Sequence, residues 1–161
     1  MTIKVGDKLP SATLAYMGDK GPAQITTEEL TKGKKVVIFG LPGAFTPTCS
    51  AKHVPGFVTG ADALKKKGVS TIACVSVNDP FVMGAWGKDQ KSGDKVMMLA
   101  DGSGVFTKAV GLDLDLTARG MGVRSTRYAM IVDNGVVKWL GVEPNPGELS
   151  ASSAEAVLSH L

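Results

Sequence analysis

Three short runs of aliphatic and β-branched residues lie in the middle of the chain, at residues 36–41, 71–77 and 96–100. Continuous apolar runs of this length are typical of buried strands. An amphipathic helical pattern follows each run, and the last of the three predicted helices ends near Val110. Because strands that alternate with helices pair in parallel, this part of the chain predicts a parallel sheet covered by helices.

The C-terminal third predicts antiparallel strands. Residues 128–132 and 136–140 are largely apolar and flank Asn134-Gly135, which is the strongest short signal of a hairpin turn. Residues 111–126 are less regular and include two glycines close together, so we expect them to form a loop. A last helix is expected to begin at a serine, Ser150 or Ser152, and to continue to Leu161.

The predicted order is therefore βαβαβα followed by ββα. This order predicts an α/β protein with a mixed central β-sheet flanked by helices, and a thioredoxin-like layout fits it. The length of 161 residues suits one domain, which we expect to span residues 1–161. Hydrophobic residues make up 43% of the chain and charged residues 20%, an ordinary balance for a globular protein.

The charge pattern argues against two classes of partner. A net charge of +3 is too small to favour binding to nucleic acid or to a membrane surface. No apolar run reaches the roughly 18 residues that a membrane-spanning helix needs, and the N-terminus lacks the apolar stretch of a signal peptide. We expect a cytoplasmic protein, or an organellar one if a transit peptide was removed before this numbering begins.

The chain has two cysteines, Cys49 and Cys74, and two histidines, His53 and His160. Two cysteines are too few for a disulfide framework or a zinc site, and the histidines add no metal-binding pattern. We therefore expect no metal and no other bound cofactor, and two free thiols in a reducing compartment. Any chemistry must rest on one cysteine at a time.

Cys49 falls in the first turn of a predicted helix, with Thr46 as the N-cap and Pro47 at the first helical position. Free N–H groups and the positive end of the helix dipole lie there, and both favour a thiolate, which is the nucleophilic form. The alternative is an inert cysteine that is small enough for a helix start. The helical pattern continues to about Lys67 and contains Pro55, where we expect a kink.

The block Phe39-Gly40-Leu41-Pro42-Gly43-Ala44-Phe45-Thr46-Pro47-Thr48-Cys49-Ser50 contains Pro-x-x-x-Thr-x-x-Cys and resembles the peroxidatic motif of the peroxiredoxins. Together with residues 75–82 it is similar to the type II (peroxiredoxin-5-like) subfamily, and the resemblance runs from about Ile3 to Leu161. It implies a thiol-specific peroxidase that reduces hydrogen peroxide and small organic hydroperoxides through a sulfenic acid on Cys49. It also implies a role in antioxidant defence and cell redox homeostasis, and a non-covalent homodimer packed near the active-site loops.

The resemblance assigns a role to three further residues. Thr46 would accept a proton from the peroxide and orient it, Pro42 would shield the pocket from water, and Arg127 would stabilise the thiolate and the leaving oxygen. The alternatives are an N-cap for Thr46, a turn former for Pro42 and a surface arginine for Arg127. Arg124 is a second candidate for the arginine's role.

His53 lies one turn beyond Cys49 and could be taken for the base of a Cys–His pair. We expect a structural or surface role for His53 instead, because a cysteine activated by an arginine needs no base.

Regeneration of the thiol is the step where the chain departs from the family pattern. Type II members often carry a second reactive cysteine near the C-terminal helix, but residues 147–153 contain none. Cys74 lies in the middle of an apolar strand and is expected to be a packed core thiol that cannot readily reach Cys49. The most similar pattern is that of plant-type members, which implies an external thiol as reductant, either glutathione with glutaredoxin or thioredoxin.

Two other functions remain open at this point. A thiol–disulfide oxidoreductase on the same fold normally has Cys-x-x-Cys, whereas Ser50-Ala51-Lys52 follows Cys49. A redox sensor or holdase-like binding protein would use a cysteine of the same reactive character, and the sequence separates it poorly from a peroxidase.

Overall fold

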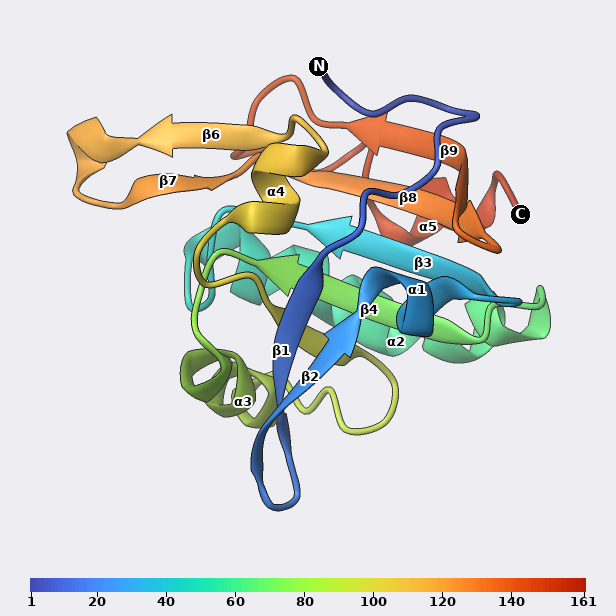
Figure 1. The fold of residues 1–161 in the computed structure, drawn as a ribbon, viewed down its shortest axis with the longest axis horizontal. Coiled ribbons are helices and arrows are strands. Elements are labelled where there is room, and N and C mark those ends of the chain that lie inside the picture. Colours follow the sequence, from blue (N-terminus) through green and yellow to red (C-terminus); the bar gives the residue numbers. More distant parts are fainter.

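A seven-stranded mixed sheet forms the centre of the computed structural model, which describes residues 1–161 (Figure 1). The strands lie in the order β2 (Gly21–Thr26), β1 (Thr13–Gly18), β5 (Met97–Ala100), β4 (Thr71–Ser76), β3 (Lys35–Gly40), β8 (Tyr128–Asp133) and β9 (Val136–Val142). β3, β4 and β5 pair in parallel, as the apolar runs predicted, while β1 and β8 pair antiparallel to the outer two of these.

Helices cover both faces of this sheet and enclose two hydrophobic cores. Successive residues of a strand point to opposite faces, so Val36 and Ile38 of β3 join one core and Val37 and Phe39 the other. The helices are α1 (Thr27–Thr31), α2 (Val54–Lys66), α3 (Pro80–Asp89), α4 (Val105–Ala109) and α5 (Ala154–Leu158). In Figure 1, α1 and α4 lie in front of the sheet and α2 behind it.

The predicted hairpin is confirmed. β8 and β9 pair antiparallel around Asn134 and Gly135, whose φ angles of 48° and 81° are both positive. A two-residue turn of this kind needs positive φ at both positions, which explains the Asn-Gly pair. β8 also pairs with β3, and Tyr128 faces Gly40 across the two strands. A β-carbon on Gly40 would come within 2.2 Å of the Tyr128 ring, so only glycine fits there.

The prediction of a loop over residues 111–126 is wrong. β6 (Asp113–Leu116) and β7 (Gly122–Ser125) form a two-stranded antiparallel arm that projects from the body of the protein (Figure 1). A short 3-10 turn (Thr117–Arg119) joins them. The arm is too short and too polar to produce an apolar run, which is the signal that identified the central strands.

The two ends of the chain also differ from expectation. The N-terminal elements β1, β2 and α1 went unpredicted. β2 and α1 carry no continuous apolar run, and the run in β1 is only the four residues 14–17. The last helix, α5, begins after Ser153, whose hydroxyl oxygen accepts a hydrogen bond from the Ala156 N–H, and ends at Leu158 rather than Leu161. None of the helices is long and apolar enough to cross a membrane.

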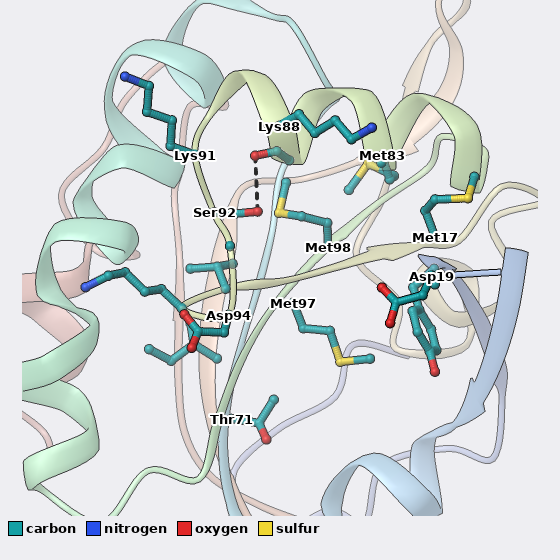
Figure 2. Close-up of a pocket in the computed structure, with 18 of the residues that line it drawn as sticks. Met17, Asp19, Thr71, Met83, Lys88, Lys91, Ser92, Asp94, Met97 and Met98 are labelled. Carbon is teal, nitrogen blue, oxygen red and sulfur yellow. Dashed lines mark hydrogen bonds between the residues drawn. The ribbon is translucent and has the colours of Figure 1, made fainter. Parts of the chain in front are cut away.

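A cavity of about 1020 Å³ opens between α3, the β1–β2 hairpin and the segment that leads into β5 (Figure 2). Methionine side chains, among them Met17, Met83, Met97 and Met98, form much of its apolar wall. The cavity lies near Thr71, at the amino end of β4. Cys49 follows the carboxyl end of the parallel neighbour β3, so this cavity and Cys49 are at opposite edges of the sheet.

Candidate active site

Cys49 lies just beyond the carboxyl end of β3, in a helical stretch that begins at Pro47. Its side chain is fully buried. Cys49 also begins a π-helical turn, η1 (Cys49–His53), in which the Val54 N–H donates to the Cys49 carbonyl. Pro55 has no N–H to offer the Ala51 carbonyl, so the irregularity expected from this proline takes the form of a wide turn just before it. π-helical turns occur frequently at functional sites.

The guanidinium of Arg127 contacts the sulfur of Cys49. Nη2 of Arg127 donates a hydrogen bond to Sγ at 3.2 Å, and both side chains are buried. The contact follows from the topology: β8 runs antiparallel to β3, so the residue before β8 lies beside the residues that follow β3. A buried cation at this distance can stabilise negative charge on the sulfur.

Arg124, the second candidate arginine, contacts backbone carbonyls and not the sulfur of Cys49. Its Nε donates to the Met121 carbonyl at 2.9 Å and its Nη1 to the Pro42 carbonyl at 3.3 Å. Gly43 leaves room for this contact, because a β-carbon there would come within 2.5 Å of Nη1. Arg124 therefore supports the loop before Cys49, while Arg127 reaches the sulfur.

His53 holds the other side of the Arg127 guanidinium. Nη1 of Arg127 donates to Nδ1 of His53 at 2.9 Å, and Nε2 of His53 lies 2.9 Å from the Ser152 carbonyl. Since a carbonyl can only accept, these partners require the neutral tautomer with hydrogen on Nε2. Burial and the nearby positive charge of Arg127 lower the pKa of His53 to about 3. His53 is thus a buried partner of the arginine, not a surface residue.

Thr46 and Pro42 shape the loop in front of the sulfur. Thr46 stands at the predicted N-cap position, because the helical stretch begins at Pro47 and the Ser50 N–H donates to the Thr46 carbonyl at 3.0 Å. Its hydroxyl makes no capping bond and donates instead to the Gly43 carbonyl at 2.7 Å. Because its hydrogen is engaged, the hydroxyl oxygen keeps its lone pairs for a donor on a substrate. Pro42 is buried, and the Ala44 N–H that follows it bonds to the Asn78 side chain at 3.0 Å.

Cys74 is a packed core thiol, as its apolar strand predicted. It lies in the middle of β4, opposite Phe39 of β3, and is fully buried in the same core as Cys49. Burial, followed by the negative charge of an ionised Cys49, raises the pKa of Cys74 well above that of an ordinary thiol. Both cysteines are free.

Two residues near the site were not singled out from the sequence. Trp86 of α3 donates from its indole N–H to the Ser50 hydroxyl at 3.1 Å, beside Cys49. Glu143 follows β9 and is buried, and its carboxylate accepts hydrogen bonds from Ser150 and Ser152. Burial raises the pKa of Glu143, but these hydrogen bonds outweigh it and hold the pKa below its ordinary value. No local motif marks either residue: Trp86 bonds to a residue 36 positions away, and Glu143 bonds to serines of the irregular segment that follows β9.

This arrangement can perform one kind of chemistry well: nucleophilic attack by a thiolate that a buried arginine stabilises. No group of three or more His, Cys, Asp or Glu side chains is placed to hold a metal ion. The fold and the site together define a thiol-based redox protein of the thioredoxin-like class.

Comparison with known proteins narrows this class. The model of the Redoxin family matches residues 4–158. The chloroplastic peroxiredoxin-2E of Arabidopsis thaliana is 53% identical over 164 residues, which cover 99% of this chain and 70% of that protein. Reduced Prx3 of Vibrio vulnificus, solved in complex with hydrogen peroxide, is 52% identical, with a TM-score of 0.93 over 98% of both chains. A Burkholderia cenocepacia protein described as a putative thioredoxin reductase is 55% identical, with a TM-score of 0.97 over 100% of this chain and 99% of that one.

The chain therefore belongs to the Redoxin family, within which it is a type II peroxiredoxin. It is a thiol-dependent peroxidase, which reduces a peroxide at the expense of a thiol reductant. The expected thioredoxin-like fold, with a mixed sheet flanked by helices, is confirmed.

Proposed function

We propose that Cys49 is the thiolate that attacks the peroxide, and the observation that carries this proposal is the 3.2 Å contact from Arg127 to its sulfur. The sulfur attacks one peroxide oxygen, the O–O bond breaks, and Cys49 becomes a sulfenic acid. The other oxygen leaves with the electron pair of that bond and takes up a proton, giving water from hydrogen peroxide or an alcohol from an organic hydroperoxide.

The surrounding residues have distinct parts in this proposal. Arg127 stabilises both the thiolate and the charge that develops on the leaving oxygen, and arginine stays protonated at any working pH. The Thr46 oxygen, whose own hydrogen bonds to Gly43, accepts a hydrogen bond from the peroxide O–H and orients the substrate. Pro42, buried at the end of the strand, limits access of water and keeps these interactions strong.

Regeneration in this scheme uses a thiol from outside the chain, in a cycle with one reactive cysteine. Cys74 is held in the centre of β4, so it cannot reach Cys49 without disrupting the sheet. One external thiol condenses with the sulfenic acid, releases water and forms a mixed disulfide, and a second thiol then releases Cys49 by exchange. Glutathione with glutaredoxin, or thioredoxin, would supply these electrons, and no bound cofactor is required.

A peroxidase assay with matched variants tests the proposal. Cys49→Ser should abolish peroxide reduction, because a serine hydroxyl is not ionised at neutral pH. Cys74→Ser is the control and should retain most of the activity. The assay is run once with glutathione and glutaredoxin and once with thioredoxin, which also identifies the preferred reductant. Ordinary turnover by Cys49→Ser would refute the assignment.

A thiol–disulfide oxidoreductase or a redox sensor is the competing function. The first is disfavoured because the residues after Cys49 supply no second thiol. A redox sensor shares the same reactive cysteine, but it is oxidised once and is reduced slowly. Its turnover number in the assay above would therefore be low, whereas that of a peroxidase is high.

We further propose a non-covalent homodimer of the single domain, residues 1–161, in the cytoplasm. Phe45, Phe81 and Val105 are 55%, 64% and 58% exposed, and each lies shortly after the carboxyl end of one of the three parallel strands. The three side chains therefore lie at the same edge of the sheet as Cys49. Phe45 also has a φ of 62°, a rare backbone conformation for a large residue. Exposed apolar side chains gathered at one edge favour a protein partner there, which sedimentation of Phe45→Ser and Phe81→Ser would test.

A further inference from the structure

A strap of residues 144–152 returns from the end of β9 across the surroundings of Cys49. Three of its carbonyl oxygens accept hydrogen bonds from side chains that flank the sulfur. Pro146 accepts from Nε of Arg127 at 2.9 Å, Gly147 from the Thr48 hydroxyl at 3.1 Å, and Ser152 from Nε2 of His53 at 2.9 Å. The strap therefore supports both ends of the turn that carries Cys49, as well as its arginine.

Glu143 is the anchor of this strap. Its carboxylate accepts four hydrogen bonds: from the N–H groups of Ser150 and Ser152 at 2.9 and 2.7 Å, and from their hydroxyls at 3.2 and 2.6 Å. The carboxylate forms no salt bridge within 4 Å, so these bonds to the strap are its principal contacts. The Glu143 N–H donates to the Arg127 carbonyl at 2.9 Å, which places the anchor beside the arginine that the strap supports.

The strap also lies directly on β9. A β-carbon on Gly141 would come within 2.1 Å of the Ala151 carbonyl, so the glycine permits the close approach that brings Ser150 and Ser152 to the carboxylate. Hydrogen bonds to an ionised group are roughly twice as strong as neutral ones, and four of them converge on one buried carboxylate here. Glu143 and Gly141 together therefore determine where the strap lies on β9.

We propose that Glu143 is a positioning residue for peroxide reduction: by holding the strap in place, it fixes Arg127 and His53 and so aims the guanidinium at the sulfur of Cys49. This inference rests on the proposed function, in which Arg127 activates Cys49. The guanidinium makes three hydrogen bonds, to the Cys49 sulfur, to the Pro146 carbonyl and to the His53 ring. The strap provides the Pro146 carbonyl directly, and it holds the His53 ring through the Ser152 carbonyl.

The first measurement is the rate constant for oxidation of reduced protein by the first equivalent of hydrogen peroxide, followed by rapid quenching and mass spectrometry. A misplacement of about 1 Å in a catalytic group can cost about 100-fold in rate. Glu143→Ala, which removes all four acceptor bonds, should lower the rate constant about 10- to 100-fold, and Glu143→Gln should lower it less. Glu148→Gln is the matched control, because Glu148 lies in the same strap but is exposed, and it should stay within about twofold of the parent.

Three outcomes separate positioning from a merely structural role. If Glu143→Ala unfolds more easily but reacts at the parent rate while folded, the inference is overturned. If Glu143→Ala slows an Arg127→Gln protein by the same factor as it slows the parent, Glu143 does not act through the arginine, and the inference is again overturned. The expected result is that Glu143→Ala adds little once Arg127 has been replaced.

A second variant keeps the test decisive if Glu143→Ala does not fold. The double variant, with Ser150→Ala and Ser152→Ala in one protein, lacks two hydroxyl donors and keeps the two backbone N–H bonds to Glu143. A lower rate constant in this protein supports the inference, and a rate constant within about twofold of the parent overturns it. Failure of the proposed function has a different signature: the parent would then react with peroxide no faster than Cys49→Ser.

Discussion

Replacement of His53 by glutamine tests whether the buried imidazole beside Arg127 is neutral. In the folded protein the pKa of His53 is lowered to about 3, whereas an unfolded histidine titrates near 6.5. Between these values the unfolded chain binds a proton that the folded chain does not. Stability from this group is therefore complete above pH 6.5 and is lost progressively as the pH falls toward 3.

The size of the effect follows from the two pKa values. Each pH unit within this window corresponds to about 1.4 kcal/mol, so lowering the pH from 7 to 5 should cost the parent protein about 2 kcal/mol through His53 alone. The pKa of Glu143 is lowered as well, but its contribution is lost only below the ordinary carboxyl range. The interval from pH 7 to pH 5 therefore isolates the histidine.

Urea unfolding at pH 7, 6 and 5 measures this difference, because changes in the midpoint at constant slope report changes in stability. His53→Gln should be less stable than the parent at pH 7, since it disturbs the bonds to Arg127 and Ser152, but its stability should depend less on pH. His160→Gln, which changes the other, exposed histidine, should keep the parent's pH dependence. Parallel pH dependence in the parent and in His53→Gln would refute the assignment of a neutral, buried His53.

Three further expectations follow from the site. Arg127→Gln should slow the reaction of reduced protein with peroxide by about 100-fold or more, as removal of a key charge-stabilising donor does in other enzymes. Arg124→Gln should have a smaller effect, and stopped-flow measurement of the two rate constants tests this difference. Peroxide added without thiols should leave Cys49 one oxygen heavier and trappable by dimedone, and a rapid loss of two hydrogens would instead indicate a bridge to Cys74 or to a second chain. Cys74→Ser should lower the urea midpoint, because it buries a hydroxyl in an apolar core, while leaving the rate of the first peroxide equivalent nearly unchanged.

The elements that could be predicted are those with a strong local signal. β3, β4 and β5 lie in the centre of the sheet, and burial on both faces makes each a continuous apolar run. The β8–β9 hairpin is specified by one dipeptide, Asn134-Gly135. β2, by contrast, is an edge strand with the sequence Gly-Pro-Ala-Gln-Ile-Thr, which contains two polar residues, a glycine and a proline. Its existence depends on pairing with β1 and not on its own pattern.

The candidate site also contains residues that a local motif marks and residues that only the fold brings together. Pro42, Thr46 and Cys49 lie within eight residues of one another, so a sequence motif can identify them together. Arg127 could be proposed only through resemblance, because its place beside Cys49 requires the antiparallel pairing of β3 with β8. Nothing in the sequence near Glu143 indicates that its carboxylate would accept four hydrogen bonds from a strap that ends at Ser152. Such contacts are consequences of the tertiary fold.

The burial of Cys49 sets opposite requirements for the two halves of the proposed cycle. Attack on peroxide needs Arg127 held against the sulfur, and the bonds from Arg127, Thr48 and His53 provide this rigidity. Reduction needs a bulky external thiol to reach a side chain that is fully buried, so the turn η1 must open and those same bonds must break. A π-helical turn is a reasonable place for such an opening, because its hydrogen-bond pattern is already irregular. In the proposed cycle, stronger contacts of Thr48 and His53 with the strap would therefore speed oxidation and slow reduction.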